Sequence, residues 1–167
     1  MVRLWIGIDD TDSKDGMCTT YVGALVVDRL RKLGAKIIDF PRLIRLNPNW
    51  KLKTRGNCAV ALNVEVQEQK VLGIKNMVLK TVEELAELDH DTTNPGVVFY
   101  QSEKIPVKLK AFSKKVIQDT VTIEEADALA RDIGAEVHKF KLGRGIIGGL
   151  AAIGNTLEKD WTFELIA

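Results

Sequence analysis

The sequence predicts an α+β fold, because strand and helix patterns alternate in the order strand, helix, strand, strand, helix, strand over the first hundred residues. Short alternating apolar runs rich in β-branched residues mark the strands, and apolar residues three and four positions apart mark the helices. This order is typical of a ferredoxin-like unit. The length of 167 residues suffices for one domain or two small ones.

Residues 3–8 alternate and are rich in branched side chains, so we expect a strand there, followed by a polar loop over 9–17. Apolar residues then recur with helical spacing over 19–33, and Gly34 supplies a helix end. The next apolar run predicts a strand over 36–46.

A turn signal, Asn47-Pro48-Asn49, separates that strand from the next one, which is predicted over 59–66. Helical spacing with an acidic, solvent-facing side follows over 71–88. A short strand over 96–100 completes the first half of the chain.

Beyond residue 101, the clearest signal is a capping box formed by Thr122 and Glu125, which opens a helix that ends near Ile133. The other elements expected in this half are a lysine-rich helix within 104–118, a strand over 136–140, a glycine-punctuated segment leading into a short helix that ends near 154, and a last strand over 161–166.

The composition is that of an ordinary globular protein, with 46% hydrophobic residues, 28% charged residues and a net charge of +1. No apolar stretch approaches the roughly 20 residues of a membrane helix, and the first residues do not have the layout of a signal peptide. We therefore expect a cytoplasmic protein without a membrane partner. Two cysteines and two histidines, none in a CxxC pair, predict no zinc site.

The most informative segment is an acidic loop at the end of the first predicted strand. Asp9, Asp10 and Asp12 lie within four positions, and like charges this close repel each other unless a cation compensates them. Magnesium with a phosphorylated ligand fits oxygen donors of this kind, and Thr19 opens a predicted helix whose amides favour phosphate. The alternative is a simple turn with Thr19 as a helix cap; three acids in four positions favour the metal site.

A second candidate site lies in the glycine-punctuated segment near the end of the chain. Lys139 and Lys141 alternate along the predicted strand, Arg144 follows between glycines, and Gly145 would let a backbone amide approach phosphate closely. This pattern predicts phosphate binding. An ordinary glycine-rich turn with solvated lysines is the equally weighted alternative.

A third candidate is a basic segment between Lys36 and Cys58, which holds six basic residues against one acid. Basic and apolar residues alternate there, and Trp50 could stack on a base, so contact with RNA is one interpretation. The candidate RNA-binding residues are Arg42, Arg45, Lys53 and Arg55. The alternative is a basic exposed hairpin.

Six motifs, which span nearly the whole chain, resemble the archaeal TiaS family of isoleucine-tRNA agmatinylcytidine synthetases. They are IGIDDTDS (6–13), GMCTTY (16–21), FPRLIRLNP (40–48), KTRGN (53–57), TNPG (93–96) and GRGIIG (143–148). The resemblance implies a kinase-like α/β domain followed by a ferredoxin-like α+β domain, which we assign to residues 1–100 and 101–167. This assignment conflicts with the residue pattern, which places the ferredoxin-like order in the first hundred residues. It also implies ATP and magnesium as cofactors, and an isoleucine tRNA and agmatine as substrates.

In this family, ATP phosphorylates the carbonyl oxygen of the wobble cytidine, and the amine of agmatine then displaces the phosphate. The resemblance assigns magnesium and the ATP phosphates to Asp9, Asp10 and Asp12, and it makes the Thr19 hydroxyl a candidate phospho-acceptor near the transferred group. By the same resemblance, the phosphate-binding residues of the second candidate site are Lys139, Lys141 and Arg144.

Full members of the family also carry an OB-like domain and a zinc ribbon, for which this chain has neither the length nor the cysteines. We therefore expect a fragment or a short homologue. Two other functions stay open on the sequence: a non-catalytic RNA-binding module, which predicts salt-dependent RNA binding without ATP binding, and an unrelated small-molecule kinase, which predicts indifference to tRNA and agmatine.

Overall fold

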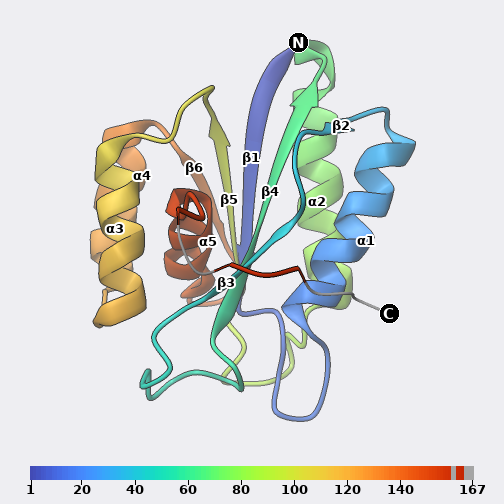
Figure 1. Ribbon diagram of the computed structural model, residues 1–167. Coiled ribbons are helices and arrows are strands. Elements are labelled where there is room, and N and C mark those ends of the chain that lie inside the picture. Colours follow the sequence, from blue (N-terminus) through green and yellow to red (C-terminus); the bar gives the residue numbers. More distant parts are fainter. Residues whose placement is uncertain (159–160, 164–167) are drawn as a thin grey trace.

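The computed structural model describes residues 1–158 and 161–163. Its centre is a six-stranded sheet in the order β2–β4–β1–β5–β6, with β3 also paired to β4 (Figure 1). All of its pairings are antiparallel. The strands are β1 (Val2–Asp9), β2 (Lys36–Ile37), β3 (Arg42–Arg45), β4 (Cys58–Val66), β5 (Gly96–Gln101) and β6 (Glu136–Lys139).

Helices cover both faces of this sheet (Figure 1). Helices α1 (Thr19–Lys32) and α2 (Val71–Leu85), the latter preceded by the 3-10 turn η1 (Glu68–Lys70), lie on one face. Helices α3 (Val107–Gln118), α4 (Ile123–Ile133) and α5 (Gly145–Gly154) lie on the other. The result is a three-layer α+β unit.

Burial on both faces explains why the central strands are almost uninterrupted apolar runs. In β1, Leu4, Ile6 and Ile8 join the hydrophobic core under α1 and α2, whereas Trp5 joins the core under α3, α4 and α5. Because neighbouring residues of a strand point to opposite faces, a strand covered on both sides buries every position.

Helix α5 packs directly on the backbone of the sheet, because glycines leave no side chains between the two. A Cβ atom at Gly7 of β1 would overlap the carbonyl group of Gly149 in α5. A Cβ atom at Gly148 would overlap the carboxylate of Asp9. This close packing brings the first turn of α5 to the point where β1 ends.

Most predicted elements are present, including the capping box. The Thr122 hydroxyl accepts from the amide of Glu125 at 3.2 Å, and the Glu125 carboxylate accepts from the amide of Thr122 at 2.9 Å. The strand predicted over 36–46 is instead divided into β2 and β3. Pro41, just before β3, has no amide hydrogen to donate to a ladder, which breaks the pairing there.

The predicted helix over 71–88 ends earlier, at Leu85, where Ala86 turns to an extended conformation. The last strand predicted over 161–166 is absent at residues 161–163, and its remainder lies outside the described residues. Within the described part of the chain, no helix has the length and apolar character needed to cross a bilayer.

Candidate functional site

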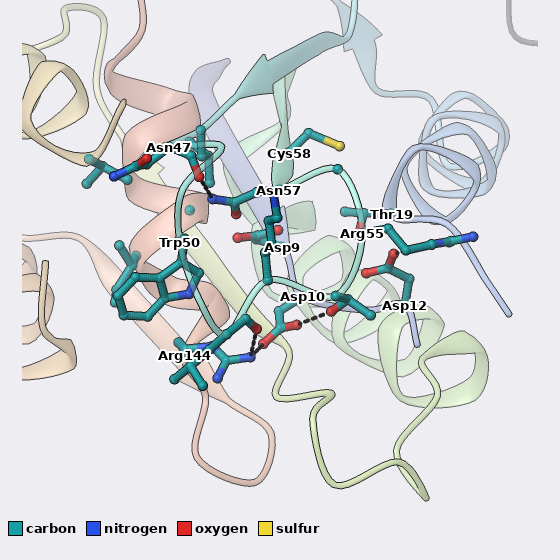
Figure 2. A pocket seen from close by; sticks show the side chains of 18 of the residues that line it. Asp9, Asp10, Asp12, Thr19, Asn47, Trp50, Arg55, Asn57, Cys58 and Arg144 are labelled. Carbon is teal, nitrogen blue, oxygen red and sulfur yellow. Dashed lines mark hydrogen bonds and ion pairs between the residues drawn. The ribbon is translucent and has the colours of Figure 1, made fainter. Parts of the chain in front are cut away.

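A single pocket brings the acidic loop together with distant parts of the chain (Figure 2). Its wall is formed by the end of β1, the start of α1, residues 46–58 of the basic segment, the end of α3 with the residues that follow it, and the first turns of α5. The polar lining residues include Asp9, Asp10, Asp12, Thr19, Arg55 and Arg144. Three segments that the sequence singled out separately thus meet at one place.

Asp9 is the last residue of β1 and lies partly open to the pocket. Burial raises the pKa of its carboxyl well above the ordinary value, and the negative charge of Asp10 raises it further. The Asp10 amide and the more distant Arg144 oppose this rise only in part. Asp9 is therefore a carboxylate whose charge is poorly compensated, as expected for a group that meets a cation.

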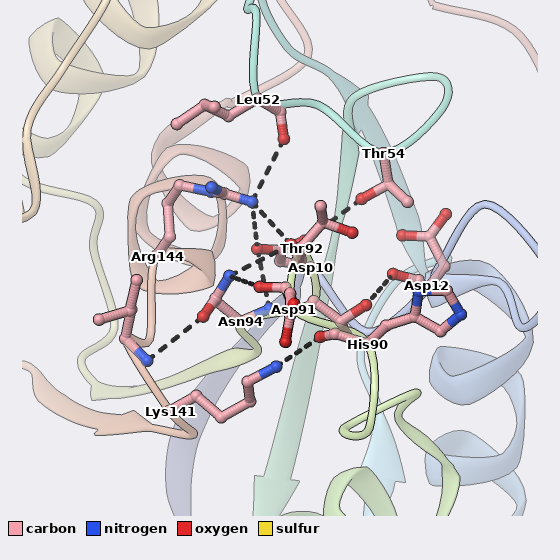
Figure 3. Close-up of polar contacts among 12 residues, drawn as sticks. Asp10, Asp12, Leu52, Thr54, His90, Asp91, Thr92, Asn94, Lys141 and Arg144 are labelled. Atoms are coloured by element: carbon pink, nitrogen blue, oxygen red, sulfur yellow. Dashed lines mark hydrogen bonds and ion pairs between the residues drawn. The ribbon is translucent and has the colours of Figure 1, made fainter.

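Asp10 connects three loops of the pocket (Figure 3). Its Oδ2 accepts hydrogen bonds from Arg144 Nη2 at 3.0 Å and from the amide of Asn94 at 3.2 Å, and its Oδ1 accepts from the Thr54 hydroxyl at 3.5 Å. Burial raises its pKa, although Arg144 and the amide of Asn94 pull it down. The backbone of Asp10 is left-handed, with φ 59°, a conformation that is uncommon for non-glycine residues and that aspartate adopts more readily than most.

Asp12 is neutralised from the opposite side of the pocket. Arg55 Nε donates to Asp12 Oδ2 at 3.0 Å, and another nitrogen of Arg55 donates to the carbonyl of Met17. The carbonyl of Asp12 accepts from the Thr93 hydroxyl at 2.8 Å. Arg55 remains about half exposed, so this pair can exchange partners when an anionic ligand arrives.

Thr19 is the first residue of α1, and its hydroxyl lies 2.9 Å from that of Thr11 in a buried contact. Cys18 precedes it as an exposed helix cap. Partial burial raises the pKa of Cys18, but hydrogen bonds from Thr20 and Tyr21 outweigh this and lower the pKa below its usual value. Both side chains line the pocket.

The three predicted magnesium ligands do not form one ready cluster. Across residues 1–158 and 161–163, no group of three or more histidine, cysteine or acidic side chains could hold a metal ion. Asp10 and Asp12 are each paired with an arginine. The site still fits magnesium, which usually binds one or two protein carboxylates together with substrate phosphates, and Asp9 carries the charge that such an ion would compensate.

Of the predicted phosphate-binding residues, only Arg144 lines the pocket. Lys139 pairs with Asp127 of α4, and Lys141 donates to the carbonyl of His90 (Figure 3). The amide of Gly145 donates to the carbonyl of Asn94 at 3.0 Å. A Cβ atom at Gly145 would overlap the carbonyl of Asp9, so this glycine permits close packing.

The predicted RNA-binding residues also separate. The Arg42 guanidinium lies over the Trp5 ring at 5.0 Å, pairs with Asp39 at 2.6 Å and donates to the carbonyl of Asn155 at 3.0 Å. Lys53 and Arg55 line the pocket, and Arg45 is exposed on β3. Arg42 is thus engaged inside the fold, whereas the other three keep access to a ligand.

Sequence reasoning missed several residues that line this pocket or contact its acids. Thr54, which lines the pocket, and Asn94, which only contacts Asp10, lie in the motifs KTRGN and TNPG, which gave no indication of these contacts. Val116, in the last turn of α3, and Val121, which follows that helix, form part of an apolar wall. Nothing in the local sequence distinguishes them from other core residues.

Comparison with known proteins gives a consistent assignment. A family model described as the TiaS TCKD domain matches residues 5–142. The chain belongs to the TiaS family. This match runs through residue 100, where we expected a domain boundary.

Two curated TiaS relatives, each named as a 2-agmatinylcytidine synthetase of an isoleucine tRNA, illustrate the similarity. The one from Thermococcus sibiricus is 54% identical over 167 residues, covering 100% of this chain and 38% of the relative. The one from Pyrococcus horikoshii is 51% identical over 164 residues, covering 98% of this chain and 38% of the relative. The chain therefore spans well under half the length of these relatives.

Solved TiaS structures have the same fold. The crystal structure of TiaS in complex with an isoleucine tRNA and ATP matches with a TM-score of 0.89 at 46% identity, covering 95% of this chain and 37% of that one. A complex of TiaS with the tRNA, AMPCPP and agmatine matches with a TM-score of 0.85 at 45% identity. This match covers 95% of this chain and 38% of that one.

Proposed function

We propose that this chain is the ATP-using catalytic part of an isoleucine-tRNA 2-agmatinylcytidine synthetase. It would phosphorylate the wobble cytidine of an isoleucine tRNA and allow agmatine to displace the phosphate. The observation that supports this most directly is the pocket, where the poorly compensated Asp9, two acids paired with arginines and a helix-start threonine meet in a TiaS-family fold. The names and ligands of the relatives, which include ATP, an isoleucine tRNA and agmatine, agree with it.

Within this pocket we assign the roles by charge and accessibility. Asp9 would hold magnesium, with Asp12 as a second oxygen donor once Arg55 leaves it for a phosphate. When bound, the metal would neutralise negative charge on the ATP phosphates. Arg144 would hold Asp10 and the neighbouring loops in place, and Thr19 would be the phospho-acceptor candidate at the start of α1.

Phosphoryl transfer depends mainly on positioning and on neutralisation of charge, which suits a pocket built from several fixed loops. Arg45 and Lys53 would contact the tRNA backbone near the pocket mouth. Recognition of the rest of the tRNA would depend on the parts by which the relatives exceed this chain in length.

For the domain organisation, we propose a different division from the predicted boundary at residue 100. Strands β1 to β5 with α1 and α2 have the order and the one-sided helices of a ferredoxin-like unit. Strand β6 extends the same sheet from β5, and α5 supplies part of the pocket. The kinase-like role would therefore belong to the described unit as a whole.

Calorimetry of ATP binding, with and without magnesium, tests the proposal on the 167-residue chain. Magnesium-dependent binding should be lost in Asp9→Asn and retained in Asp127→Asn, a matched control in α4 that lies outside the pocket lining. Equal binding by wild type and Asp9→Asn would contradict the assignment. Magnesium-dependent ATP turnover with a small metabolite, unchanged by added tRNA and agmatine, would favour the small-molecule kinase.

A further inference from the structure

Two hydroxyl groups, those of Thr11 and Thr19, meet behind the wall of the pocket, with their oxygens 2.9 Å apart. Thr11 lies in the acidic loop after β1, and Thr19 begins α1. Thr19 lines the pocket on the side that also holds Asp12 and Arg55 (Figure 2), whereas Thr11 does not belong to the lining. A residue behind the wall therefore contacts the side chain that we assign as the phospho-acceptor candidate.

Both threonines are held in place and depend on each other for hydrogen bonding. Thr11 is fully buried, and Thr19 is 3% exposed. The amide of Glu87, which follows α2, donates to the carbonyl of Thr11 at 3.0 Å and fixes its backbone. Among residues 1–158 and 161–163, neither hydroxyl makes a hydrogen bond other than the one between them.

The burial of Thr11 determines which hydroxyl donates. Each hydroxyl has one proton and can also accept. If Thr19 donates, the proton of Thr11 stays in the interior with no acceptor among the described residues, which is unfavourable. If Thr11 donates, its proton is satisfied, and the proton of Thr19 can turn toward the pocket, where water or a ligand accepts it. The second arrangement satisfies both groups.

We propose that Thr11 is a positioning residue for phosphoryl transfer to Thr19. This rests on the proposed function, which takes the pocket as the ATP site and Thr19 as the phospho-acceptor. The Thr11 hydroxyl donates to Thr19 Oγ1, restricts the rotation of that side chain, and leaves the proton and a lone pair of Thr19 facing the pocket. Orientation of the reacting groups supplies much of the rate of phosphoryl transfer.

The transfer itself leaves Thr11 unchanged. Thr19 Oγ1 forms a bond to the γ-phosphorus of ATP, and the bond from that phosphorus to the bridging oxygen of ADP breaks. ADP leaves with the electron pair of the broken bond, and the proton of Thr19 passes to water in the pocket. The hydrogen bond from Thr11 persists in the product, because the ester oxygen of phosphothreonine is still an acceptor.

The test measures single-turnover phosphate transfer from magnesium–ATP to Thr19 in the 167-residue chain. Mass spectrometry locates the phosphate, and calorimetry measures the ATP affinity. Thr11→Val keeps the shape of the side chain without its hydroxyl, and it should slow transfer about 10- to 100-fold while leaving the ATP affinity unchanged. Thr11→Ser keeps the hydroxyl and should retain most of the rate. If thermal unfolding shows that Thr11→Val does not fold, Thr11→Ala replaces it in the same comparison.

Thr81→Val is the matched control. Thr81 lies in α2, is also fully buried, and lies outside the pocket lining. Its hydroxyl donates to the carbonyl of Met77 at 2.7 Å and accepts from Arg29 Nη1 at 2.7 Å. This substitution should lower the stability of the protein without changing the rate of transfer to Thr19.

Equal transfer rates in wild type and Thr11→Val would show that Thr11 only fills the interior, and would overturn the inference. Equal losses in Thr11→Val and Thr11→Ser would do the same, because the size of the side chain would then matter and not its hydroxyl. If the wild-type chain binds magnesium–ATP but transfers no phosphate to Thr19, the inference is wrong while the ATP site of the proposed function stands. Failure of the wild-type chain to bind magnesium–ATP would reject both.

Discussion

Asp10 and Arg144 form a largely buried ion pair, 3.0 Å long, between residues 134 positions apart in the chain. The same Arg144 nitrogen also donates to the carbonyls of Leu52 and Thr92. The pair joins the acidic loop, the basic segment, the loop before β5 and the start of α5. It therefore holds the pocket together, and changes on either side of it should affect stability as well as binding.

Arg144→Ala should destabilise the fold by about 3–5 kcal/mol, because it leaves the buried carboxylate of Asp10 without its partner. Chemical denaturation measures the free energy of unfolding. Lys108→Ala, which removes an exposed ion pair with Asp132, should cost only about 0–1 kcal/mol. Asp10→Asn in the Arg144→Ala background should recover part of the lost stability. If Arg144→Ala lowers the free energy of unfolding as little as Lys108→Ala does, Arg144 does not have this structural role.

Asp9→Asn should stabilise the protein at pH 7 while removing its magnesium-dependent ATP binding. The raised pKa of Asp9 means that the folded state keeps a proton at pH values where the unfolded carboxyl has lost it. The stability linked to this group is therefore complete below the ordinary pKa of 3.8 and is lost as the pH rises through the folded value. Since asparagine does not titrate, the gain should shrink as the pH falls toward 4.

Urea denaturation between pH 4 and pH 7 measures this effect. Asp28→Asn, on the exposed surface of α1, provides the control and should not stabilise the protein at pH 7. A stability difference between Asp9→Asn and wild type that stays constant over this range would exclude Asp9 as the perturbed group.

Gly148→Ala should weaken magnesium–ATP binding and destabilise the fold by about 1–3 kcal/mol, because its methyl group would overlap the Asp9 carboxylate. Gly73→Ala in α2 is the matched helix control, since a Cβ placed there would meet no atom within 4 Å besides the adjoining residues and the backbone of its own helix. It should raise stability by roughly 0.5–1 kcal/mol through helix propensity. Thermal unfolding and ATP calorimetry compare the stability and the magnesium–ATP affinity of the two variants. Equal stability and equal affinity would contradict close packing at Asp9.

Arg42→Ala should mainly affect stability and Arg45→Ala should mainly affect RNA binding, although both arginines lie on β3. Arg42→Ala should destabilise the protein by about 1–3 kcal/mol, because it removes the contacts with Trp5 and Asp39. Arg45→Ala should change stability by no more than about 0.5 kcal/mol.

RNA binding measured at several salt concentrations completes the comparison of these two variants. Arg45→Ala should reduce the steepness of the plot of log affinity against log salt concentration by about one unit, as expected for the loss of one phosphate contact. If Arg42→Ala lowers that slope without loss of stability, Arg42 is an RNA contact after all.

Local patterns in the sequence predicted much of this molecule. The apolar run of β1 and the polar residues after it located the end of a strand, and the spacing in α1 located the helix that begins at Thr19. The capping box at Thr122 was also predictable, because its two hydrogen bonds join residues only three positions apart. Such features depend on neighbours along the chain.

Local sequence patterns could not predict which of the candidate residues meet in the pocket. Lys139, Lys141 and Arg144 form one basic segment in the sequence, yet Lys139 turns to α4, Lys141 to the carbonyl of His90, and only Arg144 enters the pocket. Their directions depend on how β6 ends and on how closely α5 approaches the sheet. No local signal carries that information.

The sequence by itself therefore determined the elements, the acidic loop and the resemblance to the TiaS family, because these depend on residue spacing. Only the tertiary structure decided which carboxylate is paired and which is not. It joined Asp10 to Arg144 and left Asp9 poorly compensated, because the glycines of α5 let that helix settle on the backbone of β1. Burial and charge at the site follow from this packing, which sequence spacing does not record.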